Sequence, residues 1–389
     1  MPRFIPNFLH ISGKTILSLA NISVGLAMII SAFAGAVDSE LFPVVAIAGM
    51  TYPVWVPLML LAGIADALWM RRWAIWVGIV FALTMSMTVK TLPVNIPRGP
   101  VPKTLKADSW TLMSYNVAAF MDVTDLKSPV SPNPTLNYIL FHSPDVVILQ
   151  EVETLPTAGS YGVTQAQVDS LNATYPTILL GHGKGHDITL FSKFPAERLS
   201  DIEQIFSAPT YPGNQRIGVF RLTIDGQAVL LIGVHLQSIG LTTDDKELYG
   251  ELTRGEGITN REEIKAAKTD LLSKLADANA IRGKQAKIIA DAIDSLDIEN
   301  VIVAGDFNDV PGCFAYRQLE QSGLRAVYPQ VGSGYKMTFN ADRFYFMIDH
   351  IFVKGNFVPW SIKRGDLKTS DHYPQLVTFV KTPDRHFVK

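Results

Sequence analysis

The chain has a single cysteine and no excess of basic residues. One cysteine, Cys313, among 389 residues excludes an intrachain disulfide. The formal net charge is −2, and after residue 90 the chain carries 29 Lys and Arg against 33 Asp and Glu. Because a protein that follows the DNA backbone usually carries a basic excess, this balance argues against tight binding of duplex nucleic acid.

Three common catalytic signatures are also missing. The sequence has no nucleophile elbow around a serine, no Cys/His spacing typical of metal sites and no glycine-rich phosphate loop. Cys313 follows Pro311 and Gly312, and nothing near it suggests a lowered thiol pKa. We therefore expect Cys313 to be a small buried residue rather than a nucleophile.

Charge is absent from three long stretches near the N-terminus. Residues 15–37, 41–65 and 73–89 form charge-free runs of 23, 25 and 17 residues. A spanning helix needs about 17–25 residues, so we predict three transmembrane helices, with Pro53 and Pro57 kinking or breaking the second. A cleaved signal peptide is the alternative, but the first run is longer than a usual signal core and two more runs follow.

The charges beside these runs predict an orientation. Arg3 and Lys14 precede the first run, and Arg71 and Arg72 lie between the second and third. The positive-inside rule places both groups in the cytoplasm. Three crossings then put everything after Lys90 on the periplasmic or extracellular side of an inner or plasma membrane.

Asp66 is an ionisable residue close to a membrane face. We expect it to pair with Arg71 or Arg72 at the cytoplasmic interface. A relay role in transport would need partners in other spans, and no second intramembrane charge occurs.

Composition divides the chain into three parts. Residues 1–90 form the membrane anchor, residues 91–107 a linker with four prolines, and residues 108–389 a further domain. A proline-rich segment of this length is typically extended. It would hold the domain close to the lipid surface.

Residues 301–312 contain the clearest functional pattern of this domain. A β-branched apolar run predicts a buried strand, and Asp306 and Asn308 at its end lie two apart, so their side chains leave the same face. A carboxylate and an amide at a strand end can hold a hydrated cation, a water molecule and a phosphate oxygen together. Two capping residues in a surface turn are the alternative.

Other apolar runs also end in polar residues. We predict strands over residues 109–117, 145–152, 187–194, 216–224, 228–238, 344–353 and 375–380, with Asp225-Gly226 as a hairpin turn. Apolar residues at three- and four-residue steps predict a helix from about residue 260 to 297. The polar residues at the strand ends are Asn116, Glu151, His235, Asp349, Asp371 and His372. Any one of them would more often be structural, but the set as a whole indicates a catalytic site.

This set of side chains suits attack of water on phosphorus. Carboxylate oxygens favour a hard cation such as Mg²⁺ over Zn²⁺. Two histidines without ligand-like spacing are better suited to proton transfer and hydrogen bonding. The metal ion would neutralise charge on the phosphoryl oxygens while a His–Asp pair activates water.

Six motifs, in order, resemble those of the endonuclease/exonuclease/phosphatase superfamily over roughly residues 108–382. They are Ser114-Tyr115-Asn116-Val117, Leu149-Gln150-Glu151, Gly233-Val234-His235-Leu236, Gly305-Asp306-Phe307-Asn308, Ile348-Asp349-His350-Ile351 and Ser370-Asp371-His372-Tyr373-Pro374. The resemblance implies an α/β fold, a four-layer sandwich with two packed, mostly antiparallel sheets, preceded here by about three transmembrane helices. It also implies a phosphoric ester hydrolase that depends on a divalent metal ion.

The resemblance assigns a metal site to three residues. Glu151 would be the principal Mg²⁺ ligand with Asn116 beside it, and Asp371 would support the site. Mn²⁺ is a possible substitute for Mg²⁺.

The resemblance also assigns catalytic roles. His372 would be the general base, oriented by Asp349, and Asp306 would position or activate the water. Asn308 and His235 would hold the scissile phosphate. Which of Asp306 and His372 takes the proton stays open.

Four further features of this chain are less settled. Arg216 is a tentative phosphate ligand or a surface arginine, and Arg282 and Gln285 match a recurrent pair with a structural role. Residues 181–187 either contact substrate or form a hairpin tip, and the role of the loop at 240–260 stays open.

Three functions fit this sequence. The first, which we favour, is an outward-facing membrane phosphodiesterase or phosphatase acting on a lipid headgroup or another small phosphoester. The second is an endonuclease or exonuclease outside the cytoplasm, and the third is an inactive binding module. The acidic balance argues against the second, and the complete set of site residues argues against the third. The sequence does not predict the oligomeric state, the number of metal ions or the substrate.

Overall fold

The computed structural model describes most of the chain. The described residues are 4–69, 71–124, 130–152, 154–180, 187–207, 210–213, 216–240, 261–296, 298–341 and 344–381. The predictions for residues 181–186 and 241–260 lie outside these ranges.

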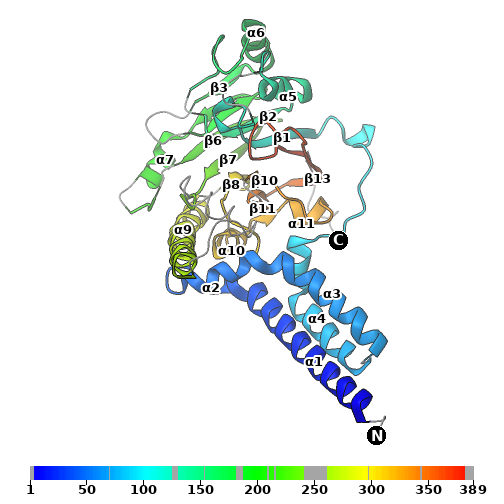
Figure 1. The fold of residues 1–389 in the computed structure, drawn as a ribbon. Coiled ribbons are helices and arrows are strands. Elements are labelled where there is room, and N and C mark those ends of the chain that lie inside the picture. The colour runs from blue at the N-terminus through cyan, green and yellow to red at the C-terminus, as the bar shows by residue number, and fades with distance from the viewer. Residues whose placement is uncertain are drawn as a thin grey trace.

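Two six-stranded mixed sheets form the domain after the linker (Figure 1). The first sheet has the order β13 (Phe357–Arg364), β14 (Gln375–Lys381), β1 (Ser109–Asn116), β2 (Val146–Gln150), β4 (Thr189–Ser192) and β3 (Thr177–Leu179). The second has the order β5 (Ala196–Arg198), β6 (Ile217–Ile224), β7 (Gln227–His235), β8 (Val301–Asp306), β12 (Asp349–Lys354) and β9 (Arg325–Ala326). A separate hairpin consists of β10 (Phe339–Ala341) and β11 (Phe344–Phe346).

Both sheets follow one pairing pattern. Each has a single parallel pair at its centre, β1–β2 in the first and β7–β8 in the second, and all other pairs are antiparallel. The predicted hairpin turn is confirmed, because Ile224 pairs with Gln227 and the two residues between them have positive φ. This is the backbone that an Asp-Gly turn favours.

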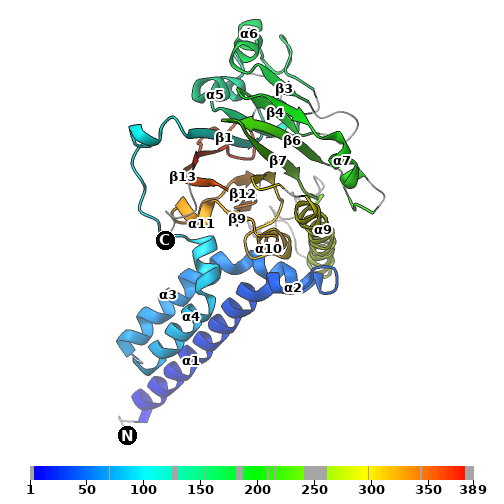
Figure 2. The same ribbon diagram turned by 180° about the vertical axis from the view of Figure 1, so that it is seen from behind.

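The core lies in three layers that alternate with the sheets. Residues from both sheets, among them Leu112, Leu231 and Ile302, pack between them. The residues next to them in the chain point outward. Met113 of the first sheet packs toward α5 (Pro134–His142) and α6 (Gln165–Thr174). Val303 of the second sheet packs toward α9 (Arg261–Ser295) and α10 (Phe314–Gln321). This alternation gives the predicted four-layer sandwich, with helices on both outer faces (Figures 1 and 2).

The remaining short helices lie between these elements. They are α7 (Ser200–Ser207), α11 (Tyr328–Val331) and the 3₁₀ turns η1 (Ala34–Ala36), η2 (Ala48–Thr51), η3 (Arg71–Trp73), η4 (Lys103–Leu105) and η5 (Ala118–Phe120). The single strand predicted over residues 344–353 is wrong. Met347 and Ile348 separate β11 from β12, and Thr338 Oγ1 accepts the backbone N–H of Ile348 instead.

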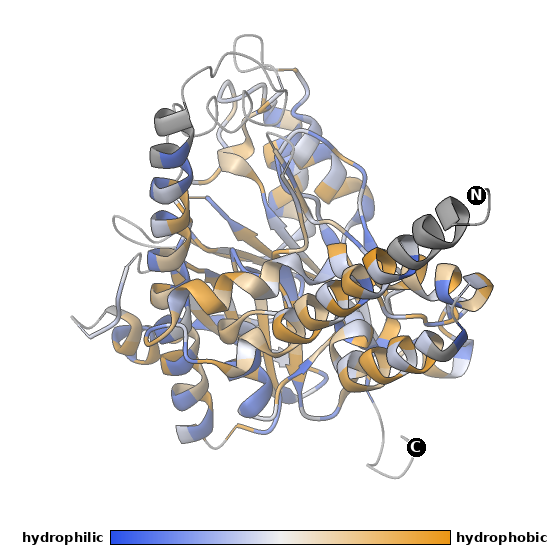
Figure 3. Ribbon diagram, turned by 60° about the horizontal axis from the view of Figure 1, so that its bottom comes forward, coloured by the Kyte–Doolittle hydropathy of each residue, from blue (hydrophilic) through white to orange (hydrophobic). Residues whose placement is uncertain are grey.

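Three apolar segments at the N-terminus are long enough to cross a membrane. They are Gly13–Ala36, Pro43–Trp69 and Ala74–Thr91, within α1 (Phe4–Phe33), α2 (Pro43–Ile47), α3 (Tyr52–Trp69) and α4 (Ala74–Thr91). The second segment is broken at η2, as its prolines predicted. These helices are mostly hydrophobic along their length (Figure 3). Large apolar side chains such as Leu19 and Leu61 stay 60% and 62% exposed, which is the surface a bilayer would cover.

Asp66 has a different partner from the one the sequence suggested. Its side chain is buried among the helices, and Oδ1 accepts a hydrogen bond of 2.7 Å from Asn21 of α1. The Asn21 side chain is therefore the partner of Asp66, where the sequence predicts Arg71 or Arg72.

The apolar helices pack directly on the sandwich as well as being linked to it through the chain. Gly35 and Gly49 lie against the backbone of Gly312, where a Cβ on Gly49 would collide with the Gly312 carbonyl oxygen. Lys90 at the end of α4 pairs with Glu320 of α10 at 2.6 Å. The N-terminal apolar helices therefore contact the loop that follows β8.

The linker is extended, as predicted, and lies along the sandwich. Val94 forms a β-bridge with Ser333, and the Asn95 side chain donates to the carbonyl oxygens of Pro329 and Gly332 at 3.0 and 2.7 Å. These contacts fix the start of the linker against α11.

Candidate active site

The strand ends bring the predicted residues together. Asn116, His235 and Asp306 are the last residues of β1, β7 and β8, and Asp349 is the first of β12. Asp306 lies opposite His235 on one side and Asp349 on the other. Parallel neighbours end at the same edge of a sheet and antiparallel neighbours begin there, so the topology gathers these groups at one edge.

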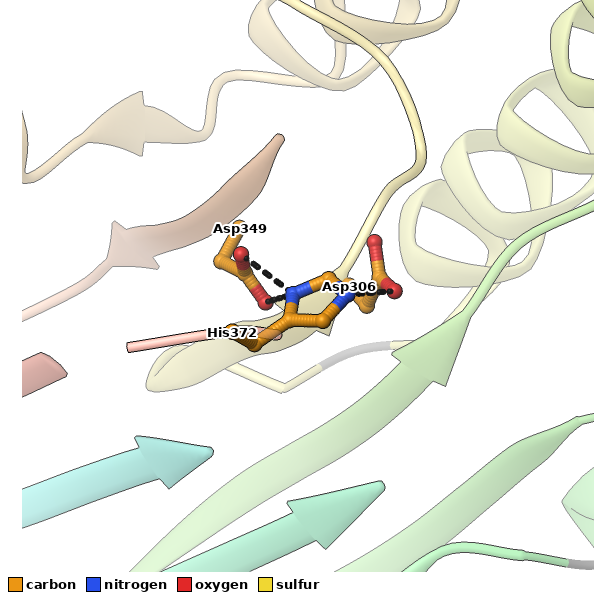
Figure 4. Close-up of side chains that lie close together, drawn as sticks. All are labelled: Asp306, Asp349 and His372. Carbon is orange, nitrogen blue, oxygen red and sulfur yellow. Dashed lines mark hydrogen bonds and ion pairs between the residues drawn. The ribbon is translucent and has the colours of Figure 1, made fainter. Parts of the chain in front are cut away.

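His372 lies between two carboxylates (Figure 4). Its Nδ1 is 2.9 and 3.1 Å from the two carboxylate oxygens of Asp349. Its Nε2 is 3.4 Å from Oδ2 of Asp306, and all three side chains are buried. The contact with Asp349 places the proton on Nδ1 and directs Nε2 toward Asp306.

His235 forms a second pair of the same kind. Its Nδ1 is 2.9 Å from Oδ2 of Asp187, and its Nε2 is 3.7 Å from the same Oδ2 of Asp306. Arg216 Nη1 lies 3.5 Å from Asp187 Oδ2 and 3.2 Å from His235 Nδ1. With the proton on Nδ1 donated to Asp187, both Nδ1 and Nη1 are donors, so Arg216 pairs with the Asp187 carboxylate and its contact with Nδ1 is not a hydrogen bond.

The Asn116 side chain is hydrogen-bonded to the carboxylates of both Glu151 and Asp306. Its Nδ2 donates to Glu151 Oε1 at 3.0 Å and to Asp306 Oδ2 at 3.2 Å. Its Oδ1 accepts the backbone N–H of Ala118 at 3.2 Å. The amide thus lies beside Glu151, as predicted, but it acts here as a donor that orients two carboxylates.

Three contacts of this network join the two sheets. They are Asn116 of β1 with Asp306 of β8, Asp187 before β4 with His235 of β7, and His372 before β14 with Asp349 of β12. A buried network whose members satisfy one another holds its groups in one arrangement. The relative position of the sheets therefore sets the site geometry.

The backbone is unusual at the same edge. Glu151 and Asn308 have φ of 61° and 50°, a conformation that costs a glutamate about 1–3 kcal/mol. Gly305 has φ of 148°, and a Cβ there would collide with the carbonyl oxygen of Val234. Strained residues held by their surroundings are common where side chains must be aimed at a reacting group.

Asn308 and Asp371 lie near the network, but their side chains contact other groups. The Asn308 side chain donates to the Leu236 carbonyl oxygen at 3.0 Å, and its backbone N–H donates to Asp306 Oδ1 at 2.8 Å. Asp371 is half-buried beside His372, with its carboxylate 3.4 Å from Ser370 Oγ. Their roles toward phosphate and metal stay predictions.

A pocket of about 490 Å³ opens beside the network. Glu151, Asp187 and Arg216 line it, together with Phe120, Leu155 and Tyr161. The side chain of Glu151 is 40% exposed, whereas those of Asp306 and Asp187 are 2% and 5% exposed. Arg216 therefore lines the pocket beside the network, and its role toward phosphate stays a prediction.

Charge around the two histidines controls their protonation. Burial lowers the pKa of His372, but Asp349 and Asp306 outweigh it and raise the pKa to about 10. Burial also lowers the pKa of His235, and the hydrogen bond to Asp187 and the charge of Asp306 raise it above its ordinary value. Without a metal ion, His372 is therefore charged at neutral pH, and the charged form of His235 is more favourable than in a free histidine.

The donor atoms fit a divalent cation. Glu151 presents a partly exposed carboxylate to the pocket, and Asn116 holds it next to Asp306. Asp306, Asp349 and His372 each offer an atom within 4.8 Å of the others, but Asp349 and His372 already satisfy each other. Oxygen donors suit Mg²⁺, so Glu151 is the better ligand and the His372 cluster the better proton-transfer group.

Three other residues that the sequence analysis named, Arg282, Gln285 and Cys313, make structural contacts. Gln285 bridges the Pro212 carbonyl oxygen and the Gln237 backbone N–H, and the fully buried Arg282 donates to the Gln237 carbonyl oxygen. Cys313 is buried, which raises its thiol pKa, as expected of a packed cysteine. These groups support the loops around the site.

Asp187 is the site residue that sequence reasoning missed. We had treated residues 181–187 together as a hairpin tip or a substrate contact. Asp187 itself is 5% exposed and is the hydrogen-bond partner of His235. The signal available was its place at the start of the strand predicted over residues 187–194.

Comparison of the sequence with family models gives two matches. Residues 113–372 match the Endonuclease/Exonuclease/phosphatase family, and residues 14–91 match a domain of unknown function (DUF8431). The first match spans most of the chain, so the chain belongs to the endonuclease/exonuclease/phosphatase family. Members of this family generally cleave phosphoesters and typically depend on a divalent metal ion.

Solved structures of low sequence identity share similarity with the chain. An endonuclease/exonuclease/phosphatase from Beutenbergia cavernae is 18% identical, with a TM-score of 0.45, covering 70% of this chain and 72% of its own. D. rerio TDP2 complexed with single-strand DNA product is 19% identical, with a TM-score of 0.43, covering 70% and 98%. Beta toxin from Staphylococcus aureus is 16% identical, with a TM-score of 0.41, covering 69% and 99%. No curated protein matches the sequence.

Proposed function

We propose that this protein is a membrane-anchored, Mg²⁺-dependent phosphoesterase that hydrolyses small phosphoesters or lipid headgroups outside the cytoplasm. The observation that carries the proposal is the convergence of two His–Asp pairs on one carboxylate. Nε2 of His372 and Nε2 of His235 lie 3.4 and 3.7 Å from Asp306 Oδ2. The hydrogen-bond partners of this group, Glu151 through Asn116 and Asp187 through His235, line the neighbouring pocket.

Asp306 is the group we assign to the water. The pKa of His372 is raised to about 10, so its imidazole is charged at neutral pH and has no free lone pair for a proton. Asp306 then accepts the proton as the water oxygen attacks phosphorus and the bond from phosphorus to the leaving oxygen breaks. Of the two candidates that the sequence left open, Asp306 and His372, we therefore favour Asp306 as the group that takes the proton.

The two imidazolium groups have a complementary task. Each carries a proton on Nε2 that faces the place where a phosphoryl oxygen would lie, and each is oriented through Nδ1 by a buried carboxylate. Fixed positive charge in a water-poor site stabilises a transition state that gains negative charge. A divalent ion at Glu151 would add to this stabilisation and orient the phosphate.

Charge and membrane placement favour a small substrate. The residues after position 90 carry a small acidic excess, and three apolar segments could cross a membrane. The arginines at positions 71 and 72 favour a cytoplasmic turn, which leaves the pocket outside. A long nucleic acid would meet little basic surface here.

The test uses the full chain in lipid nanodiscs, because the anchor packs on the loop after β8. We would offer bis-p-nitrophenyl phosphate, p-nitrophenyl phosphate, phospholipid and plasmid DNA, each with Mg²⁺ and with EDTA. Metal-dependent turnover of a small ester or lipid, lost in Asp306→Asn and kept in the exposed hairpin variant Asp225→Asn, supports the proposal. Rapid plasmid nicking with little ester turnover would favour a nuclease, and no turnover by folded protein would contradict it.

A further inference from the structure

A second cavity lies between the linker and the sandwich and shares no lining residue with the active-site pocket. Its volume is about 330 Å³. Its walls are linker residues 95–98, the end of α11 with residues 330–333, and residues 360–363 of β13, with Lys336 beside them. This cavity has no part in the chemistry proposed above.

The charges on this cavity have one sign. Arg98, Lys336 and Lys363 line it, and no Asp or Glu is among its described lining residues. Burial and the charge of the neighbouring Arg364 lower the pKa of Lys336, and Nη1 of Arg364 is buried without a hydrogen-bond partner. Cations gathered without a counter-charge create a positive potential that attracts an anion.

The linker is fastened over the cavity, so the cavity is a formed feature of the fold. Trp360 Nε1 donates to the Gly99 carbonyl oxygen at 2.8 Å, and the Arg98 guanidinium lies 5.3 Å from the centre of the Trp360 ring. At the other end, Asn95 donates to two carbonyl oxygens of the α11 region. These contacts hold the linker, with Arg98, against the β13 wall that carries Lys363.

The cavity also lies next to the membrane anchor. α4 ends at Thr91, and Asn95 is four residues further on, which places it within about 14 Å of the helix end even if the chain is fully extended. α11 packs against α4. Val94 and Ile96 are 92% and 91% exposed, so two apolar side chains extend from the linker beside the cavity.

We propose that this cavity binds the phosphate of an anionic phospholipid headgroup, from the leaflet in which α4 ends. The cations would hold the phosphate, while Val94, Ile96 and Trp360 would lie in the interfacial region, where apolar and aromatic side chains are favourable. The inference rests on the membrane placement of the proposed function and is independent of its chemistry.

The experiment titrates the full chain in detergent, with EDTA present, using dihexanoyl phosphatidylglycerol, dihexanoyl phosphatidylcholine and inorganic phosphate. Calorimetry would give the affinity, and hydrogen exchange would show which backbone amides are protected. The test variant is Lys336→Gln with Lys363→Gln, and the matched control is Lys265→Gln with Lys268→Gln, two exposed positions on α9.

We expect phosphatidylglycerol to bind and to protect residues 93–98. Each lysine near an anionic headgroup contributes about fivefold, so the double glutamine variant should bind about 30-fold more weakly. Replacing both lysines with arginine should retain binding, which separates loss of charge from loss of folding. The control should bind like the parent chain.

Three results would overturn the inference. If the glutamine variant binds phosphatidylglycerol as tightly as the parent chain, the lipid binds at another site. If phosphatidylcholine binds as tightly as phosphatidylglycerol, the net negative charge of the lipid does not contribute to binding. Inorganic phosphate bound as tightly as the lipid would make this a site for free phosphate. None of these depends on turnover, so they are distinct from a failure of the proposed hydrolysis.

Discussion

The two His–Asp pairs of the site have the same geometry in different surroundings. In each, Nδ1 lies 2.9 Å from an aspartate oxygen, and Nε2 is directed at the same oxygen of Asp306. Both pairs are buried, and Phe339 lies against the His372 ring with the ring centres 5.0 Å apart. The pair of His235 has Arg216 beside it, and its aspartate lines the open pocket.

This difference indicates a division of labour. A carboxylate that pairs with one cationic group stabilises the charge of that group alone. Asp187, in contrast, pairs with both His235 and Arg216. We therefore propose that His372–Asp349 acts at the reacting centre and that His235–Asp187–Arg216, two members of which line the pocket, acts where a phosphate would enter. The predictions below compare the two pairs.

The largest expected effect is that of Asp349→Asn. The amide keeps the shape but removes the charge that fixes the proton on Nδ1 and sustains the imidazolium form, so kcat should fall by about 10³- to 10⁴-fold. Steady-state kinetics in nanodiscs, with Asp225→Asn as the matched control, would measure it. A loss of less than tenfold would mean that the His372–Asp349 pair is structural.

Asp187→Asn should have a smaller effect on kcat. Arg216 still offers positive charge beside His235, so we expect a loss of about 10- to 100-fold, with a rise in KM. The same assay gives both parameters. If this variant were more damaging than Asp349→Asn, the roles assigned to the pairs would be reversed.

The smallest effect is a change of stability with pH in metal-free protein. The pKa of His372 is raised to about 10 from an ordinary value near 6.5. Its contribution is therefore fully present below about pH 6.5 and is lost as pH rises through about 10. Thermal unfolding in EDTA should show a falling Tm over this range, and His372→Gln should flatten the curve more than His142→Gln, an exposed control. Parallel curves for all three proteins would contradict the raised pKa.

Much of the site could be predicted from sequence because strand ends are local features. Asn116, His235, Asp306 and Asp349 each terminate or begin an apolar run, and sheet topology then brings such ends together. Asp187 was missed because its function depends on a contact with the other sheet. No local pattern records which carboxylate faces which histidine.

The packing of the anchor could not be predicted at all. Charge-free runs showed that helices exist near the N-terminus, but nothing in those runs indicates that Gly49 meets Gly312. Glycines that allow two backbones to touch resemble any other glycine in a sequence. The same limit applies to Asp66, where a buried amide from another helix replaced the nearby arginines as the partner.

The most direct test of the shared site is the titration of both histidines in Asp306→Asn. Histidine-labelled full-length protein in EDTA would be followed by NMR, with His235→Gln and His372→Gln used to assign the signals. Because the charge of Asp306 raises both values, the pKa of His372 and the pKa of His235 should each fall in the variant. If neither value changes, the two pairs do not converge on Asp306, and the proposed division of labour is wrong.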